Sequence, residues 1–258
     1  HRVLCTMKMS GVNVAYDSII SIAYSGGDGG FVIYVADDPG TNAGMCEQDS
    51  RGFALMSDMP MLEPASIEEA ISLTKYAFDL SEAIKGPVFV RLTTPLANGF
   101  ASVDIPDPAP VSQADALLIR DINRFTKAGA VICMTQHRDL IQRLAQAGEL
   151  IDKEGLNKLE LGKKKGGLGI IASGVTVQYV EEAMAVADKY GIDREKVSVL
   201  GLRATVPTAK KEIAKLMEHC DQILVLEELE PYIEKDVYIL ARELGFSGKI
   251  IGKIDGTY

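Results

Sequence analysis

The first residues that suggest chemistry are four glycines around one aspartate, Gly26 to Gly30 with Asp28 at the centre. Glycine-rich turns can hold phosphates, because backbone amides approach the anion closely and a following helix N-terminus attracts it. This run instead follows a helical pattern at 12–26 and precedes an apolar strand at 31–36. It lies at the wrong edge of a parallel sheet, and we interpret it as a helix stop and turn.

Three other segments follow expected strands, where open parallel sheets bind their ligands. They are polar, rich in small residues and expected at one edge of one sheet. The strands are predicted at 3–6, 31–36 and 88–92, and the segments are Met7–Asn13, Asp37–Arg51 and Thr93–Gly99. Any ligand site in the first half of the chain is expected among them.

Arg51 is the strongest candidate in these segments. A guanidinium can hold a carboxylate through two parallel hydrogen bonds, and Gln48 lies in the same segment. The alternative is an ion pair with Asp49 or Asp38, and spacing alone does not decide between the two. Lys8 could face an anion, although spacing favours solvent.

The remaining charged and metal-binding residue types form no local site pattern. The cysteines and histidines lack the spacing of a zinc site or an iron–sulfur cluster, so no metal ligands are predicted. Glu227, Glu228 and Glu230 precede an expected helix and are most simply explained by its N-terminal dipole.

Composition excludes several classes of protein. The net charge is −9 and there is no basic stripe, which argues against nucleic acid or an anionic membrane as partner. No apolar run reaches the roughly 18 residues of a membrane span. The scattered cysteines fit a reducing compartment, so a soluble, cytoplasmic protein is predicted. The chain opens on His1 without an initiator methionine, and we expect it to be an internal piece of a longer polypeptide.

Strand and helix signals alternate along most of the chain. Ser66 and Glu69 form a capping box that starts a helix ended by Gly86 and Pro87. A proline-rich segment at 104–115 marks a boundary, and a helical arm with Leu140, Ile141, Leu144 and Ala147 follows it. The predicted fold class is α/β, with two tandem, mainly parallel sheets covered by helices on both faces. The expected parts are a domain at 1–105, an arm at 106–165 and a domain at 166–258.

Long stretches of the sequence resemble the α subunit of indolepyruvate:ferredoxin oxidoreductase, a thiamine diphosphate-dependent 2-oxoacid:ferredoxin oxidoreductase. The stretches are "TMKMSGVNVAYDSIISIAYSGGDGGFVIYVADDPG", "EQDSRGFALMSDMPMLEPASIEEA", "LNKLELGKKKGGLGIIASGV", "LVLEELEPYIEKDVYILARELG" and "GKIDG". The resemblance weakens only between about Ala101 and Asp152. It implies that 1–105 is most of a pyrimidine-binding (PYR) domain and that 166–258 is a transketolase-C-like domain.

The resemblance also implies an activity and site residues. The family oxidatively decarboxylates an aryl pyruvate, coenzyme A takes the acyl group and ferredoxin takes two electrons. Arg51, with Gln48 near it, falls where related pyruvate enzymes hold the substrate carboxylate. The residues placed near the pyrimidine ring of the cofactor are Lys8, Ser10, Gly11 and Asn13. Expected partners are a diphosphate-binding domain, a second subunit, ferredoxin, coenzyme A and the 2-oxoacid, in an oligomer.

Several family features are absent from this sequence. The catalytic glutamate precedes the first strand, and the diphosphate half with its Mg²⁺ ligands and the 4Fe-4S cluster cysteines lie elsewhere. We therefore expect no catalytic residue here, and a chain that is inactive and binds no cofactor tightly by itself. The alternatives are a PYR/C-domain subunit of another thiamine diphosphate enzyme, as in 2-oxoacid dehydrogenase E1 β chains, and a non-catalytic interaction scaffold.

Overall fold

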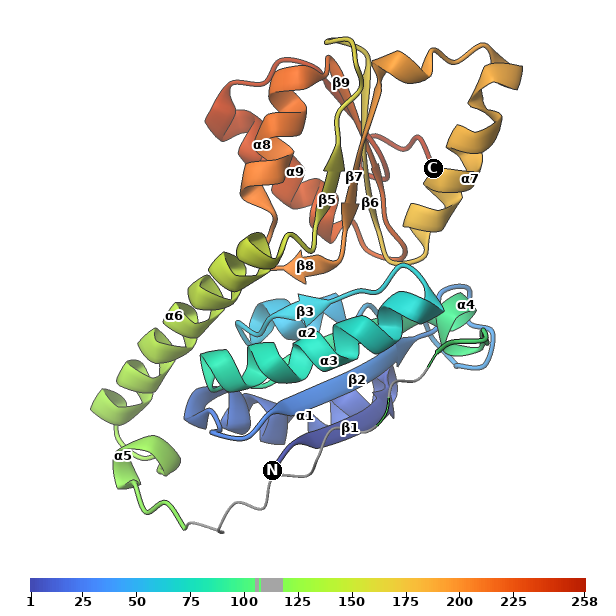
Figure 1. Ribbon diagram of the computed structural model, residues 1–258. Coiled ribbons are helices and arrows are strands. Elements are labelled where there is room, and N and C mark those ends of the chain that lie inside the picture. Colours follow the sequence, from blue (N-terminus) through green and yellow to red (C-terminus); the bar gives the residue numbers. More distant parts are fainter. Residues whose placement is uncertain (105–106, 108–117) are drawn as a thin grey trace.

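The computed structural model describes residues 1–104, 107 and 118–258, so most of the predicted proline-rich boundary lies outside the described residues. The described chain forms two layered units stacked one above the other (Figure 1). We call them unit A, built on sheet A with helices α1 to α6, and unit B, built on sheet B with helices α7 to α9. The two-sheet α/β prediction is confirmed.

Sheet A has the strand order β1-β2-β4-β3-β8 in the described residues, and its strands are parallel except β8. Its strands are β1 Val3–Lys8, β2 Phe31–Asp37, β3 Met61–Leu62, β4 Val88–Thr93 and β8 Ala204–Val206. Strand β8 comes from the second half of the chain and was not predicted from the sequence. Its pairing with β3 joins the two units through backbone hydrogen bonds.

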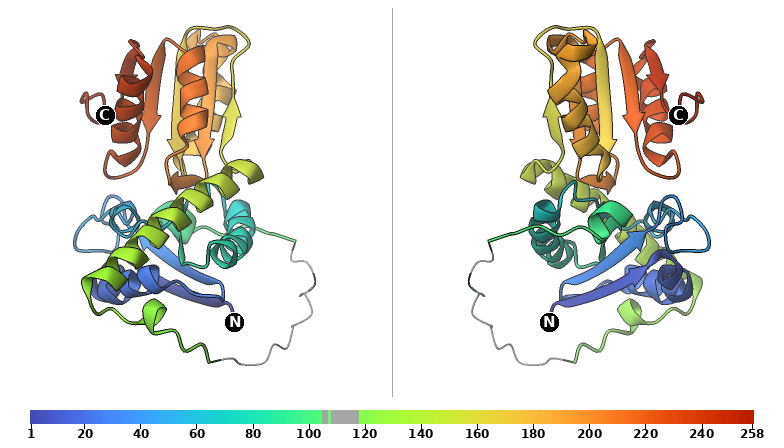
Figure 2. Two further views of the ribbon diagram at one scale, coloured as in Figure 1. Left: turned by 90° about the vertical axis from the view of Figure 1, so that its left-hand side faces the viewer. Right: turned by 90° about the vertical axis from the view of Figure 1, so that its right-hand side faces the viewer.

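Apolar stripes position the helices of unit A on both faces of sheet A. The helices are α1 Met9–Ser25, α2 Arg51–Met56, α3 Ile67–Ile84, α4 Thr94–Ala97, α5 Ile122–Phe125 and α6 Ala130–Glu154. Helix α3 covers the face of Val32 and Val90, whereas α1 covers that of Ile33 and Phe89. Helix α6 contacts both α1 and α3 and runs along one side of the unit (Figure 2).

Sheet B has the order β10-β9-β6-β7-β5 in the described residues, and only β5 is antiparallel. Its strands are β5 Lys158–Glu160, β6 Leu168–Ser173, β7 Val197–Leu202, β9 Gln222–Leu226 and β10 Lys249–Ile251. Helices α8 (Lys210–His219) and α9 (Tyr232–Leu244) pack on one face. Helix α7 (Thr176–Val186) packs on the other face and is followed by the 3-10 turns η1 (Ala187–Tyr190) and η2 (Arg194–Lys196).

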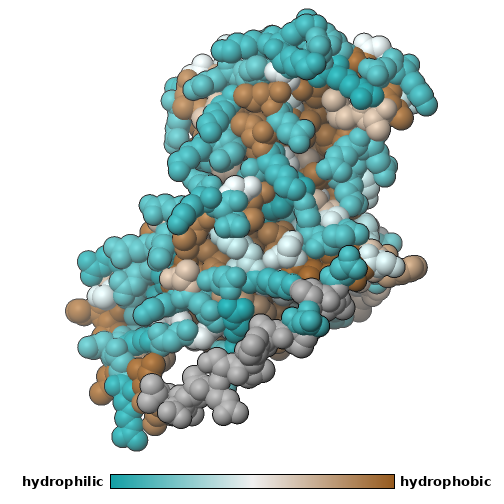
Figure 3. Space-filling model, viewed as in Figure 1, coloured by the Kyte–Doolittle hydropathy of each residue, from teal (hydrophilic) through white to brown (hydrophobic). Residues whose placement is uncertain are grey.

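Some local expectations were wrong. Met7–Asn13 is not a loop, because β1 continues to Lys8 and α1 begins at Met9. The capping box is only half formed: Ser66 accepts the Glu69 amide, but the Glu69 carboxylate accepts the Ala65 amide instead of reaching Ser66. Hydrophilic residues cover most of the face seen in Figure 3, with hydrophobic patches in each unit.

The glycine-rich run lies, as predicted, at the edge of sheet A opposite to the carboxyl ends of its parallel strands. Gly26 ends α1 with a positive φ of 64°, and its amide donates to the Ile22 carbonyl. Asp28 forms ion pairs with Arg124 and Lys85. The run is therefore a helix stop and turn with a structural aspartate.

Helix α6 offers a matched test of this packing. Leu140 is 3 % exposed in the core of unit A, whereas its neighbour Ile141, which the sequence placed in the same stripe, is 50 % exposed. Leu140→Ala is expected to lower the free energy of unfolding by about 2–5 kcal/mol, because it leaves a cavity. Ile141→Ala should change it by less than about 1 kcal/mol. Urea unfolding of both variants checks this, and equal effects would contradict the packing of α6.

Candidate functional site

The carboxyl ends of β1, β2 and β4 meet at one edge of sheet A, where two of the predicted segments come together. Asn13 in α1 donates from Nδ2 to Gln48 Oε1 at 2.7 Å. Tyr16, one turn further along α1, donates to the Phe53 carbonyl at 3.0 Å, and their rings lie 4.8 Å apart. The start of α1 is thus fixed to the segment that leads into α2.

The N-terminus of α1 presents small and basic groups at this edge. Lys8 is exposed at the N-cap position, and Ser10 and Gly11 lie in the first turn. Among the described residues, neither a side-chain cap nor an acidic residue satisfies that turn. Gly11 has a packing reason of its own, since an added Cβ would lie 3.0 Å from Met7 Cβ.

Asp38 holds the segment after β2 in a compact loop. Its carboxylate accepts the amides of Ala43 and Gly44 at 2.7 Å each and the hydroxyl of Thr94 at 2.8 Å. These hydrogen bonds, the Ala43 amide first, hold the pKa of Asp38 well below its usual range. The loop therefore connects the ends of β2 and β4.

Behind this edge lies a cluster of buried charges that joins the units, which we call the charge cluster. The exposed fraction of each side chain is 2 % or less. Its members come from β2, the loop before α2, α2 itself, β4 and the residue after β3 in unit A, and from the residue after β9 in unit B. They are Asp37, Asp49, Arg51, Glu63, Arg91 and Glu227.

Arg51 is the link of this cluster to unit B. Its Nε lies 3.0 Å from Asp49 Oδ1 and its Nη2 lies 2.6 Å from Asp49 Oδ2. Its Nη1 lies 2.5 Å from Glu227 Oε2, and Nη2 also donates to the carbonyls of Glu228 and Glu230 at 2.7 and 2.8 Å. The ion pair with Asp49, one of the two alternatives from the sequence, is therefore what the structure contains.

Glu227 has a second function at the same place. Its two oxygens accept the amides of Ile233 and Glu234 at 3.0 and 2.9 Å, so it caps the N-terminus of α9. The dipole interaction predicted for the acidic run thus applies to Glu227, and an ion pair across the units is added to it.

Arg91 forms the other half of the cluster. Its Nε donates to Asp37 Oδ2 at 2.6 Å and its Nη1 to Glu63 Oε2 at 2.9 Å. Glu63 in turn accepts the hydroxyl of Thr205 in β8 at 2.8 Å. Arg91 was not predicted as a site residue. A charged residue in the apolar strand "VFVRL" nevertheless indicates a buried charge that needs a buried partner.

The cluster carries four carboxylates against two guanidinium groups. Burial raises the pKa of Asp37 and of Glu227, although the arginines oppose that shift. Burial acts in the same direction on Asp49, but the hydrogen bond from Arg51 and the charge of Arg91 outweigh it and leave the pKa of Asp49 lowered. Burial and the arginines thus act in opposite directions on all three carboxyl groups.

A second ion pair joins the units near β8. Arg203, between β7 and β8, donates from Nε and Nη2 to the Glu69 carboxylate of α3 at 2.9 and 2.8 Å. Burial alone would raise the pKa of Glu69, but Arg203 and the Ala65 amide overcome it and lower the pKa to about 2.

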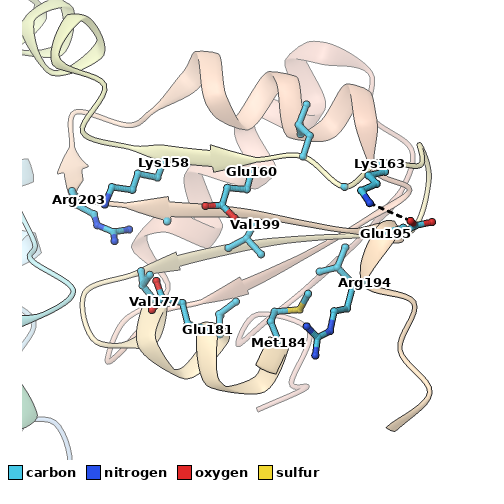
Figure 4. A pocket seen from close by; sticks show the side chains of 15 residues that line it. Lys158, Glu160, Lys163, Val177, Glu181, Met184, Arg194, Glu195, Val199 and Arg203 are labelled. Atoms are coloured by element: carbon cyan, nitrogen blue, oxygen red, sulfur yellow. Dashed lines mark ion pairs between the residues drawn. The ribbon is translucent and has the colours of Figure 1, made fainter. Parts of the chain in front are cut away.

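Several hollows are lined by the described residues, and two of them are compared as sites for a small molecule. One, of about 370 Å³, lies where α2 meets α9 and is lined by Gln48, Asp49, Gly52, Phe53, Leu55, Met56 and Tyr232. The other, of about 400 Å³, lies in unit B between α7 and the strands β5 and β7 (Figure 4). Basic groups at the second hollow already have acidic partners, such as Glu195 for Lys163 and Glu69 for Arg203. We favour the first hollow, because it adjoins the predicted segments.

The described residues contain neither a metal-binding cluster nor a membrane-spanning helix. No group of three or more His, Cys, Asp or Glu side chains in residues 1–104, 107 and 118–258 is placed to hold a metal ion. No helix in those ranges is long and apolar enough to cross a membrane.

The fold of this chain is similar to that of two solved structures. One is a 2-oxoglutarate:ferredoxin oxidoreductase from Magnetococcus marinus, with a TM-score of 0.69 and 16 % identity. That similarity covers 96 % of this chain and 49 % of the oxidoreductase chain. The other is a split-gene transketolase, of which 65 % is covered, with a TM-score of 0.55 and 16 % identity. These likenesses agree with the PYR and transketolase-C-like assignment.

Curated relatives share more of the sequence than these solved structures do. Indolepyruvate oxidoreductase subunits IorA from Thermococcus kodakarensis and Pyrococcus abyssi are 34 % and 33 % identical over 98 % of the chain, and that of Archaeoglobus fulgidus is 29 % identical over 99 %. The chain spans 38 or 39 % of the length of these relatives. No family model matches the chain. The resemblance to the α subunit of indolepyruvate:ferredoxin oxidoreductase is thus confirmed along nearly the whole chain.

The Glu69–Arg203 pair predicts a pH dependence. Because the folded-state pKa of Glu69 lies below its unfolded value, the pair stabilises the fold above about pH 4.5. That contribution is lost as pH falls from about 4.5 towards 2. Glu69→Gln is expected to cost about 2 kcal/mol at pH 7 and to weaken the loss of stability on acidification. The measurement is urea unfolding between pH 7 and pH 3.

Glu243→Gln is the matched control, because this exposed glutamate of α9 forms no ion pair within the described residues. It should keep the stability and acid sensitivity of the parent. If Glu69→Gln showed the same acid sensitivity as the parent, the pair would have no such role.

Proposed function

We propose that this chain supplies the PYR and C-terminal domains of a thiamine diphosphate-dependent 2-oxoacid:ferredoxin oxidoreductase that acts on indolepyruvate or another aryl pyruvate with coenzyme A. The observation that carries the proposal is identity of 29–34 % to IorA subunits over nearly the whole chain. The 2-oxoglutarate:ferredoxin oxidoreductase of similar fold, which has 2-oxoglutarate, coenzyme A and succinyl-CoA bound, supports the reaction class.

The edge of sheet A fits the pyrimidine side of the cofactor. Lys8 and the first turn of α1, with Ser10, Gly11 and Asn13, offer donors that no acidic or capping side chain of the described residues occupies. Asn13 is oriented by Gln48, whose side chain also lines the hollow between α2 and α9. We propose that these residues orient the ring, and that Gln48 faces the 2-oxoacid.

When bound, thiamine diphosphate supplies a nucleophilic carbon and an electron sink for decarboxylation. The residues of this chain bind and orient. Donors at the start of α1 favour acceptor groups of a ligand, since the helix dipole adds to them. The aliphatic and aromatic lining by Phe53, Leu55, Met56 and Tyr232 suits an aromatic side chain.

Ferredoxin, a second subunit, a diphosphate-binding domain and the iron–sulfur clusters belong to the same proposal, as does inactivity of the isolated chain. The expected role of Arg51 at the substrate carboxylate is not part of it, because its three guanidinium nitrogens already donate to Asp49, Glu227 and backbone carbonyls. The E1 β-like subunit and the non-catalytic scaffold are the competing functions. A scaffold would leave every 2-oxoacid unreacted, and an E1 β-like enzyme would not reduce ferredoxin.

The test uses the assembled enzyme that contains this chain, with indolepyruvate, coenzyme A and a ferredoxin or viologen acceptor. Acceptor reduction that requires both the 2-oxoacid and thiamine diphosphate is expected. Lys8→Ala or Asn13→Ala should weaken half-saturation by thiamine diphosphate about tenfold, the scale of one lost charge-assisted hydrogen bond.

Asp17→Ala is the matched control, because Asp17 is exposed on the same helix away from its first turn. It should leave cofactor saturation unchanged. If Lys8→Ala, Asn13→Ala and Asp17→Ala all show the same saturation by thiamine diphosphate, the start of α1 is not the cofactor site. Acceptor reduction that does not depend on added 2-oxoacid would refute the function itself.

A further inference from the structure

We propose that Arg51 is a positioning residue that fixes the ligand-binding edge of unit A to unit B. The inference deepens the proposed function and rests on it for its kinetic part. The geometry assigns to Arg51 a place between the units, with Glu227 on one side and Asp49 on the other.

The bonding of Arg51 leaves little capacity for a ligand. All three guanidinium nitrogens donate to protein acceptors, two of them carboxylates, and the residue is 1 % exposed. A substrate carboxylate could bind only by displacing Asp49 or Glu227. The displaced carboxylate would then stay buried without its cation, which is strongly unfavourable.

The residues near Arg51 in the chain contact the candidate site at the start of α1. Asp49 is the chain neighbour of Gln48, and Gln48 holds Asn13 at 2.7 Å. On its other side Arg51 starts α2, whose Phe53 carbonyl accepts Tyr16 of α1. Movement of the guanidinium would therefore be felt at two contacts with α1.

Unit B is held as firmly on its side. Glu227 begins the loop after β9 and caps α9, while the carbonyls of Glu228 and Glu230 accept from Arg51 Nη2. Tyr232 of α9 lies under the guanidinium, 5.5 Å from Cζ to the ring centroid, and also lines the hollow. Arg51 thus sets the separation of the two walls, α2 and α9.

The experiment compares Arg51→Gln, Glu227→Gln and the double variant with the parent in the assembled enzyme. For a positioning residue, both single variants should lower the unfolding midpoint without substrate and should lower kcat in parallel, by up to about 100-fold, with little change in KM for the 2-oxoacid. The double variant should have an unfolding midpoint and a kcat no lower than those of the more strongly affected single variant, because the two groups act as one unit.

Two further variants sharpen the comparison. Arg51→Lys keeps the charge but not the planar fork, so it should recover part of the stability and of kcat, and it replaces Arg51→Gln if that variant does not fold. Glu243→Gln is the matched control, because this exposed glutamate of α9 forms no ion pair within the described residues, and it should behave as the parent.

The opposite pattern would overturn the proposal. A rise in KM after Arg51→Gln with no effect of Glu227→Gln, and unchanged unfolding midpoints, would assign Arg51 to the substrate carboxylate. If the parent enzyme oxidises no 2-oxoacid, the proposed function fails, whereas the unfolding data still decide: additive effects of the two single variants would reject the link between Arg51 and Glu227.

Discussion

The structure depends on a buried guanidinium, that of Arg51, held between carboxylates of two different sheets. Glu227 leaves the carboxyl end of β9 and Asp49 follows the carboxyl end of β2, so the ion pairs bring together the edges where parallel sheets place their ligands. The hollow beside Gln48 and Tyr232 exists because these two edges meet.

Such a junction is costly to build and specific once built. Charges removed from water lose their hydration, and only well-placed partners compensate that loss. Arg91 extends the compensation to Asp37 and Glu63, and Glu63 returns it to β8 through Thr205. The units are thus connected through Arg51, through Thr205 and through the β3–β8 pairing, and a shift at one connection is resisted by the others.

The sequence predicted the fold well, because apolar strands and capped helices carry local signals. It predicted the strand after Gly30 and the helix after Ser66, but not β8, which is three residues long and defined by its partner β3. The start of α1 was misjudged, since Lys8 and Ser10 looked like loop residues. For Arg51, an ion pair with Asp49 or Asp38 was one of two open alternatives, whereas Glu227 lies 176 residues away and no spacing reveals it. Folding alone brings such charges together.

The most direct measurement is a crystal structure of the assembled enzyme with thiamine diphosphate and a 2-oxoacid bound. Our account predicts that Arg51 still donates to Asp49 and Glu227, with the ligand in the hollow beside Gln48 and the start of α1. A structure in which the Arg51 guanidinium leaves Glu227 and binds the substrate carboxylate would contradict it.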